Sequence, residues 1–178
     1  MKKFKINKNS SILIVGSSGE LKKRKLGKTI DTYDVVCRIN SNGTHQILNE
    51  NNKTTTGTKK NIWFCLAPGA FQKNSPSLIK QYDIVFVNNK KLYQDNILNY
   101  PNLKLFPTEI NQNCKNTLYS FNNFSFKKEP TSGLKVIFYF ITHYQEDPLG
   151  EGCMGTVYNN INLCGFDGFQ TGHWYGNQ

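Results

Sequence analysis

Short, uninterrupted runs of apolar and β-branched residues alternate with polar stretches along the chain. Six runs predict strands, at residues 11–15, 35–38, 61–66, 83–87, 103–106 and 161–164. Because strands that are buried on both faces read as continuous apolar runs, this pattern is typical of a parallel sheet. Helical segments between the strands complete an α/β sandwich. We therefore expect an α/β, single-domain, Rossmann-like fold with a mostly parallel central sheet.

One segment, residues 132–144, has the spacing of a helix with a single apolar face. Its apolar positions are Leu134, Ile137, Phe138, Ile141 and Tyr144. Residues 130–133, Pro-Thr-Ser-Gly, supply N-cap candidates at its start. The polar segment 44–60 predicts a loop, with or without a short helix. Polar connectors are predicted at residues 88–102, 112–129 and 145–160.

Composition narrows the class of protein. The 178 residues suit one domain with its own core, and 38% hydrophobic residues argue against a disordered chain. The net charge of +10 favours an anionic partner: nucleic acid, a membrane surface, or a phosphorylated or acidic substrate. Only Arg24 and Arg38 are arginines, and sequence-reading nucleic-acid binders depend on arginine for bidentate base contacts. We therefore expect no nucleic-acid partner. No apolar run reaches the roughly 20 residues of a membrane span.

The five cysteines indicate a reducing compartment. They show no Cys-x-x-Cys pair or other metal-ligand spacing, so we expect no metal site. Cys37 and Cys164 lie within predicted strands, where a reduced thiol packs as a small apolar group. The basic N-terminus is not followed by the apolar segment of a secretory signal. These features predict a cytoplasmic protein. Its net positive charge also suits peripheral contact with a membrane surface.

The turn after the first strand is a candidate anion site. Residues 16–19, Gly-Ser-Ser-Gly, let the backbone approach a phosphate, and their N–H groups and hydroxyls can donate to its oxygens. The sequence is not the Gly-x-Gly-x-x-Gly of dinucleotide-binding proteins. In addition, Arg38-Ile39-Asn40 stands where an NAD-binding strand ends in an acid. A tight turn without a ligand fits these residues as well as a nucleotide site does.

Three sets of residues, taken in order, resemble the sialylmotifs of the eukaryotic-type sialyltransferases, glycosyltransferase family 29. Residues 14–21 and 26–40 are similar to the L motif, with its glycines, its Ile-Asp pair and its closing Arg-x-Asn. Residues 130–133 and the helix after them resemble the start of the S motif, and residues 163–166 resemble its closing strand. Residues 172–176, Gly-His-Trp-Tyr-Gly, resemble the third motif. The resemblance extends over nearly the whole chain.

This resemblance implies an enzyme that transfers sialic acid from CMP-sialic acid to a glycan hydroxyl. It implies inversion at the anomeric carbon, no metal and no other cofactor, on a variant of the GT-A fold. The partners are then a CMP-sugar donor and a glycan acceptor, with a lipid-linked glycan among the candidates. Two alternatives stay open: a CMP-Kdo-dependent transferase, and an inactive remnant of the same fold that only binds nucleotide or glycan.

The resemblance also assigns candidate site residues. Contacts to the CMP phosphate and ribose are expected from Gly16, Ser17, Ser18, Gly19 and Asn40. Further nucleotide contacts are expected from the S motif, at Thr131, Ser132, Gly133, Gly165 and Phe166. Thr131 or Ser132 could instead serve only as a helix N-cap. His173, from the third motif, is the candidate catalytic acid or base. Asp31 and Asp34 are expected to be structural.

The chain departs from the family in three ways. The family's fourth motif, His-x-x-x-Glu, follows the third and carries the catalytic base, but this sequence stops at Gln178 before it. We therefore expect residues 1–178 to form a CMP-sugar-binding domain that lacks a C-terminal segment. In such a domain His173 takes the role of the base, or activity is lost. Gly176 stands where the third motif has an acid, and the family's L-to-S disulfide is missing.

Overall fold

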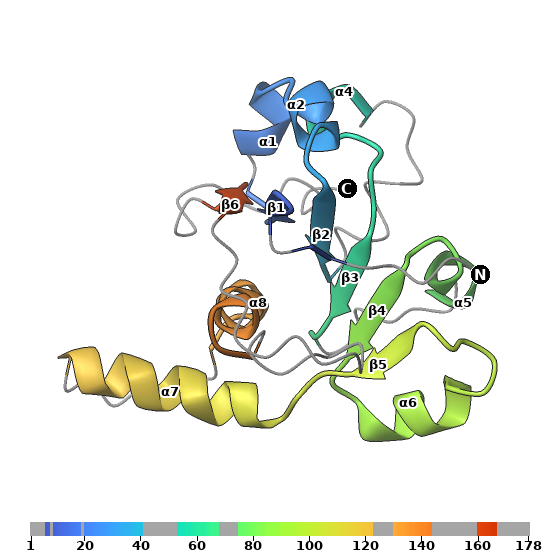
Figure 1. The fold of residues 1–178 in the computed structure, drawn as a ribbon, viewed down its shortest axis with the longest axis vertical. Helices are drawn as coiled ribbons and strands as arrows, with labels where there is room; N and C mark the ends of the chain where they lie inside the picture. Colours follow the sequence, from blue (N-terminus) through green and yellow to red (C-terminus); the bar gives the residue numbers. More distant parts are fainter. Residues whose placement is uncertain are drawn as a thin grey trace.

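A six-stranded parallel sheet forms the centre of the protein in a computed structural model (Figure 1). The structure describes residues 6–7, 9–18, 20–40, 53–67, 75–122, 130–143 and 160–166, and only the backbone of residues 20, 22, 53, 75, 76, 118–122 and 143. The strands are β1 (Ile12–Val15), β2 (Val35–Ile39), β3 (Ile62–Cys65), β4 (Ile84–Val87), β5 (Leu103–Leu105) and β6 (Ile161–Cys164). Their order is β5-β4-β3-β2-β1-β6, and every pairing is parallel. The predicted parallel sheet is confirmed.

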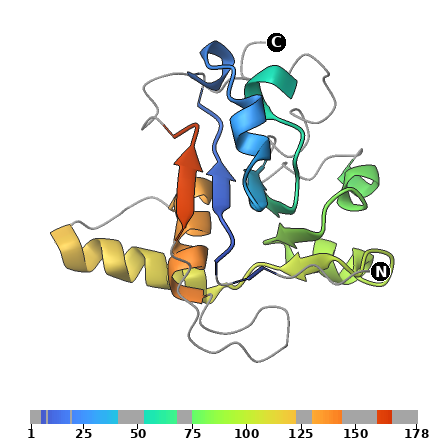
Figure 2. The same ribbon diagram turned by 45° about the horizontal axis from the view of Figure 1, so that its top comes forward.

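The register brings the carboxyl ends of three strands to the same level. Val15, at the end of β1, lies opposite Arg38 of β2 on one side and Cys164 of β6 on the other. Because all strands run the same way, the residues that follow them emerge at one edge of the sheet. In parallel α/β sheets, ligands bind at this carboxyl edge. β6 comes from the end of the described chain but lies beside β1, as Figure 2 shows.

The helices lie on both faces of the sheet. They are α1 (Glu20–Lys23), α2 (Gly27–Asp31), α4 (Lys53–Thr56), α5 (Ser75–Ile79), α6 (Lys90–Asn96), α7 (Glu109–Asn122) and α8 (Ser132–Phe138). A π-helical segment, Tyr139–His143, continues α8, so the helix predicted over residues 132–144 is confirmed as far as the structure describes it, to residue 143. The expectation that residues 88–102 and 112–129 are only connectors was wrong, because they contribute α6 and much of α7.

One face of the sheet is covered by α8, the π-helical segment and the start of α7. The ring of Phe64 on β3 stacks on Phe86 of β4 at 4.9 Å between centroids, and packs edge-on against Tyr139 at 5.6 Å and Phe140 at 5.9 Å. Such aromatic pairs contribute about 0.5–1.5 kcal/mol each beyond the area they bury. This aromatic core holds α8 against the sheet and so positions the start of that helix.

The opposite face has two apolar clusters with a cation between them. Leu21 of α1 and Ile30 of α2 pack on Val15 and its neighbours, while α5 and α6 cover Trp63 and its neighbours. The side chain of Arg38, which alternates with those of Cys37 and Ile39 along β2, points to this same face and is 0% exposed. The sheet is therefore the middle layer of an α/β/α sandwich, as expected.

Three thiols are buried in this fold: Cys37, Cys65 and Cys114. Cys164 is half-buried at the end of β6. All four are free, which agrees with the expectation of reduced, packed cysteines for those that the structure describes. Among the described helices, none is both long and apolar enough to cross a membrane.

Candidate functional site

Two segments far apart in the sequence meet at the carboxyl edge of the sheet. The backbone N–H of Gly16 donates to the carbonyl of Cys164 at 2.7 Å, and the N–H of Ser18 donates to the carbonyl of Gly165 at 3.0 Å. A Cβ atom on Gly16 would lie 2.3 Å from the carbonyl oxygen of Gly165, which is closer than atoms can approach. Gly165 itself has a φ of +73°, where glycine is strongly favoured. Both glycines are therefore required by the contact between the two segments.

The start of α8 joins this contact through an aromatic ring. A Cβ atom on Gly133 would lie 2.7 Å from Cε1 of Phe166, so the ring lies directly over the first turn of the helix. Phe166 stays 41% exposed, at the rim of the edge rather than in the core. The structure thus brings together described members of all three predicted groups: Gly16–Ser18, Thr131–Gly133 and Gly165–Phe166. The order of these segments in the sequence does not by itself place them side by side.

Thr131 is the N-cap of α8. Its Oγ1 accepts from the N–H of Leu134 at 3.3 Å, and its carbonyl accepts from Lys135 at 3.0 Å. This confirms the capping role that the sequence left open for it. The N–H groups of Ser132 and Gly133 have no hydrogen-bond partner among the described residues, as is usual in the first turn of a helix. They are donors beside a half-exposed ring, and a phosphate oxygen or other anion could accept from them.

Asn40 closes β2 in a conformation that few residues adopt. Its φ is +50°, and its Oδ1 accepts from the N–H groups of Leu66 at 2.9 Å and Ala67 at 2.8 Å. Its carbonyl accepts from the indole Nε1 of Trp63 at 2.8 Å. The side-chain oxygen therefore holds the end of β3 next to the end of β2. The Nδ2 group has no hydrogen-bond partner within the described part of the chain, and it is available as a donor.

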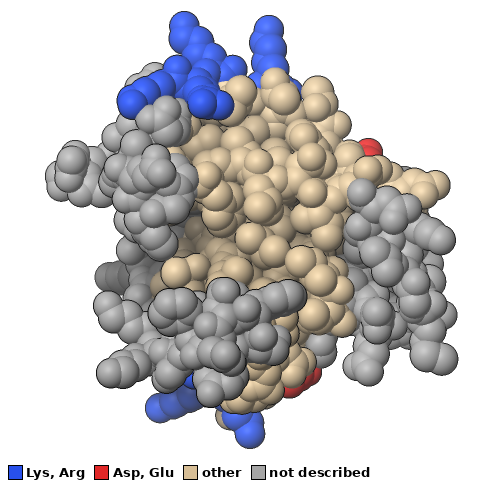
Figure 3. All heavy atoms as spheres, turned by 90° about the vertical axis from the view of Figure 1, so that its left-hand side faces the viewer, with Lys and Arg blue, Asp and Glu red and all other residues tan. Residues whose placement is uncertain are grey.

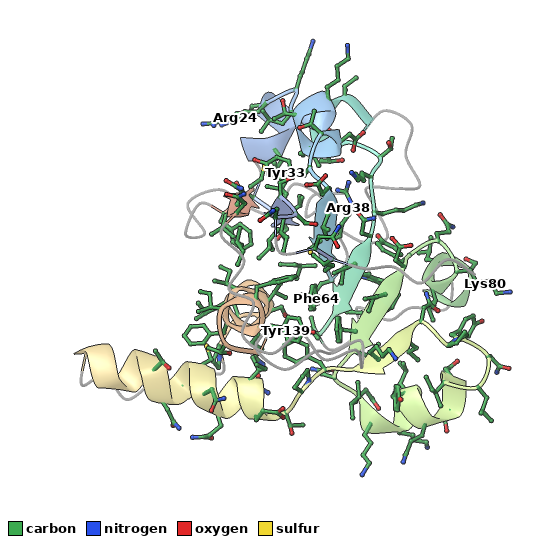
Figure 4. All side chains as sticks on the ribbon, in the orientation of Figure 1. Arg24, Tyr33, Arg38, Phe64, Lys80 and Tyr139 are labelled. Atoms are coloured by element: carbon green, nitrogen blue, oxygen red, sulfur yellow. The ribbon has the colours of Figure 1, made fainter. Side chains whose placement is uncertain are left out.

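Arg38 is a structural residue whose role the sequence analysis missed. Its Nε donates to the carbonyl of Lys59 at 3.1 Å, and its Nη2 donates to the carbonyls of Lys59 at 2.7 Å and Thr56 at 3.0 Å. Burial lowers the pKa of this guanidinium, and the nearby Tyr82 and Asp31 oppose that change. Figure 4 shows Arg38 on β2, near the segment that leads into β3. The signals in the sequence are an arginine at the end of an apolar strand and its place in the Arg-x-Asn that closes the L-like motif, and neither shows what it contacts.

Asp31 binds the same segment from the other side. Its carboxylate accepts from the N–H of Thr58 at 2.9 Å, from the Thr58 hydroxyl at 3.0 Å and from the N–H of Lys59 at 2.8 Å. Gly57, which directly precedes Thr58 in the chain, has a φ of +68°, and a Cβ there would lie 2.4 Å from Oδ1 of Asp31. Asp31 and Arg38, both within the L-like motif, together fix residues 56–59. The expectation that Asp31 is structural agrees with these contacts.

Asp34 is also structural, at the opposite edge of the sheet. Its carboxylate accepts from the N–H and from the hydroxyl of Ser11, both at 2.8 Å. These hydrogen bonds, led by the one from the Ser11 backbone, lower the pKa of Asp34 below 3.8. Among the described residues, neither acid belongs to a cluster of three or more His, Cys, Asp or Glu side chains.

Two candidate residues lie outside the described residues. Gly19 and the candidate catalytic residue His173 are not described, and neither is the third-motif segment 172–176 around the histidine. Their roles stay predictions from the sequence. The site that the structure does describe is therefore the nucleotide-binding part of the prediction: the turn Gly16–Ser18, Asn40, the start of α8, and Gly165–Phe166.

Known proteins are similar to this chain in sequence and in fold. The sequence model of glycosyltransferase family 29 (sialyltransferase) matches residues 2–96, which is more than half of the chain. No curated protein matches the sequence. The fold is similar to that of a mammalian sialyltransferase solved in complex with Gal-beta-1-3GalNAc-ortho-nitrophenol, with a TM-score of 0.60 at 16% identity, over 94% of this chain and 60% of that one.

A bacterial structure shows a similar likeness. The sialyltransferase CstII from Campylobacter jejuni, in complex with the substrate analogue cytidine-5'-monophosphate, gives a TM-score of 0.57 at 17% identity, over 93% of this chain and 65% of that one. A second structure of a mammalian sialyltransferase gives a TM-score of 0.58 at 16% identity, over 96% of this chain and 60% of that one. The present chain thus spans less than two thirds of the length of each.

Proposed function

Because the chain belongs to glycosyltransferase family 29, the sialyltransferases, we propose that it transfers sialic acid from CMP-sialic acid to a hydroxyl group of a glycan. The observation that carries the proposal is the meeting of three motif segments at the carboxyl edge of the sheet. The turn Gly16–Ser18 contacts Gly165 through its backbone, and Phe166 covers Gly133 at the start of α8. This is where a parallel α/β sheet binds nucleotides.

In this proposal the CMP portion of the donor binds between the turn after β1 and the start of α8. The N–H groups of Ser132 and Gly133 and the Nδ2 of Asn40 donate to its oxygens. Because the positive end of the helix dipole lies at the same place, negative charge there is stabilised by about 0.3–1 kcal/mol. Ser17 and Ser18, in the turn after β1, are further candidate contacts to the phosphate. The half-exposed ring of Phe166 shields one side of these polar groups from water.

The transfer reaction has three parts. The bond between the anomeric carbon and the CMP phosphate oxygen breaks, the acceptor oxygen bonds to that carbon from the opposite face, and the acceptor's proton passes to a base. Donors at the departing phosphate stabilise the charge that develops on it. His173 is the proposed base or acid, since imidazole exchanges protons near neutral pH. This set of groups works without a metal or other cofactor, and we expect a chelator to leave the rate unchanged.

A thermal-shift titration tests the nucleotide site. CMP and CMP-sialic acid should raise the melting temperature in proportion to their affinity, and AMP should not. The control is the variant Asn99→Asp, in the turn after α6, which should respond to CMP as the wild type does. If no cytidine nucleotide shifts the melting temperature, the proposed site is wrong.

A transfer assay with labelled CMP-sialic acid then tests the activity. The His173→Ala variant should lose between about 10- and 10⁴-fold in rate, the usual range for a group in acid–base catalysis. CMP binding without hydrolysis or transfer would identify the chain as a binding remnant of the fold. Turnover of CMP-Kdo in place of CMP-sialic acid would change the donor but keep the site.

A further inference from the structure

A cluster of cations lies at one end of the molecule, directly after the proposed nucleotide turn. It consists of Lys23 at the end of α1, Arg24 and Lys25 in the connection that follows, and Lys28 at the start of α2, and we name it the α1–α2 cationic cluster. All four side chains are exposed. Figure 3 shows Lys and Arg side chains that project from this end beyond the body of the protein. Leu21 of α1 and Ile30 of α2 are buried against the sheet, so the two helices next to the cluster are held in place by packing.

Among the residues that the structure describes, neighbouring acids compensate this charge only weakly. Between residues 20 and 31 the sequence has five cations and two carboxylates, Glu20 and Asp31. The carboxylate of Asp31 accepts hydrogen bonds from Thr58 and Lys59, in the loop before β3. Asp34, the next acid in the chain, is held by Ser11 at the opposite edge of the sheet. The cluster therefore presents net positive charge to whatever approaches this end.

We propose that the α1–α2 cationic cluster binds the surface of an anionic lipid bilayer. Three of its four members are lysines, which act as hydrated point charges, whereas the recognition of a single phosphate or carboxylate favours the planar fork of arginine. The side chains are exposed on the outside of a helix pair and project outward, which suits a layer of diffuse charge. Each basic residue near an anionic membrane surface strengthens binding by about fivefold.

This contact would orient the protein at the membrane. The α1 helix begins two residues after Ser18, so the end that carries the cluster also carries the turn Gly16–Ser18. Arg24 is close enough to Cys164 to affect its thiol electrostatically, and Cys164 directly precedes Gly165. The carboxyl edge of the sheet therefore lies next to the docked surface. If the proposed function holds, acceptors attached to the membrane are the ones within reach.

Vesicle co-sedimentation with the whole chain tests the proposal. The probes are vesicles of phosphatidylcholine alone and vesicles that also contain phosphatidylserine, at about 0.1 M salt, where surface charges still act over about 10 Å. We expect binding only to the anionic vesicles, and its loss at high salt. The variant Lys23→Gln/Arg24→Gln/Lys25→Gln/Lys28→Gln should weaken binding at least about 100-fold.

A charge-matched variant separates the cluster from net charge. Lys80→Gln/Lys90→Gln/Lys91→Gln/Lys104→Gln removes the same four charges from the region of α5, α6 and β5, and Figure 4 shows how far Lys80 lies from Arg24. It should bind anionic vesicles within a few-fold of the wild type. Equal losses in both variants, or no loss in the cluster variant, would overturn the proposal, and so would binding to a soluble polyanion but to no vesicle.

Two further measurements keep the outcomes distinct. Circular dichroism and the melting temperature show whether each variant is folded. Unfolding is unexpected because the substituted lysines and arginine are exposed, except Lys104, which is half-buried. The CMP-induced thermal shift is measured on the same proteins. Absence of that shift in the wild type counts against the proposed function alone, whereas the vesicle result counts for or against membrane binding alone.

Discussion

Phe166 and Gly133 are in such close contact that a single added carbon at position 133 would reach the ring, at 2.7 Å from Cε1. The contact joins the end of β6 to the start of α8, two segments separated by the helix and by a long stretch of chain. A second contact of this kind joins Gly16 to Gly165, but there the obstructing atom is a backbone oxygen at 2.3 Å. The two glycines lie at the same site and differ in what opposes them.

We predict that Gly16→Ala is much more destabilising than Gly133→Ala. At position 16 the backbone of β6 has to move, and the expected loss is about 2–3 kcal/mol in the free energy of unfolding. At position 133 the half-exposed ring of Phe166 can rotate away, and alanine favours the helix by about 0.5–1 kcal/mol, so the net change should stay within about 1 kcal/mol. Urea unfolding followed by circular dichroism measures both. Equal losses would contradict this account of the site.

A prediction for Asn40 separates its structural role from its proposed role in binding. Asn40→Ala should cost about 3 kcal/mol, because alanine is strained at a φ of +50° and the N–H groups of Leu66 and Ala67 lose their acceptor. Asn40→Asp keeps an acceptor oxygen and tolerates this φ, so its stability should stay within about 1 kcal/mol of the wild type.

The same Asp variant should bind CMP at least about tenfold more weakly, since a carboxylate replaces the Nδ2 donor beside a phosphate. Calorimetric titration of CMP into the folded Asn40→Asp protein measures this loss. The exposed Asn99→Asp variant, which adds the same charge away from the site, is the control. CMP binding that is equal in all three proteins would remove Asn40 from the nucleotide site and leave its structural role intact.

The sheet was predictable because each strand is a continuous apolar run. Strands buried on both faces cannot alternate with polar residues, so runs such as Ile12–Val15 are visible in the sequence. The α6 helix was missed because its residues are mostly polar and none is buried. Its start depends on a cap, in which Asn89 Oδ1 accepts from the N–H of Leu92 at 3.0 Å. Asparagine is common throughout this chain, so a capping asparagine does not stand out in the sequence.

The site was predictable through its motifs but not through its geometry. The resemblance named Gly16, Gly133 and Phe166, but their contacts depend on the pairing of β6 with β1. Because β5 and β6 lie at opposite edges of the sheet, the chain between them has to cross the whole sheet. The role of Arg38 could not be inferred either. Its partners are backbone carbonyls 18 and 21 positions away in the sequence. Every residue has a carbonyl, so the residue types do not show which carbonyls point toward the arginine. Sequence patterns report burial and motif identity, whereas these contacts come from topology.

A pH prediction follows from Asp34. The Ser11 N–H and hydroxyl stabilise its ionised form, so its folded pKa lies below the unfolded value near 3.8. The resulting stability is present above the unfolded pKa and is lost as the pH falls through the folded pKa. Ser11→Ala should therefore raise the pKa of Asp34 toward 3.8, as measured by NMR titration of the carboxyl carbon. Ser10→Ala removes a neighbouring hydroxyl that bonds to Asn7 and should leave the pKa unchanged. A shift of similar size in both variants would contradict the assignment.

The thiols should differ in reactivity according to their burial. Burial raises the pKa of Cys37 far above its usual range and that of Cys65 to about 12, so neither has appreciable thiolate at pH 8. Iodoacetamide should label neither of them in the native protein and both after unfolding in urea. Cys164 is half-buried, and the cations of Arg24 and Arg38 partly offset the rise in its pKa, so it should react faster than both. Peptide mass spectrometry resolves the sites. Native labelling of Cys37 as fast as that of Cys164 would show that β2 is not buried in solution.

The last prediction concerns the geometry of the Arg38 guanidinium rather than its charge. Its Nε and Nη2 groups form a fork of donors to the carbonyls of Lys59 and Thr56. In Arg38→Met the carbonyls of Thr56 and Lys59 lose their donors while the cost of burying a cation disappears, and we expect a loss of about 2–4 kcal/mol. In Arg38→Lys the charge stays buried, but one ammonium cannot reproduce the fork, so this variant should be at least as unstable as Arg38→Met. Urea unfolding measures both, with Lys60→Met as a control at a less buried cation beside it. A lysine variant close to the wild type would mean that charge alone suffices. If geometry is decisive instead, both variants should also loosen residues 56–59, which faster amide hydrogen exchange at Thr58 and Lys59 would detect.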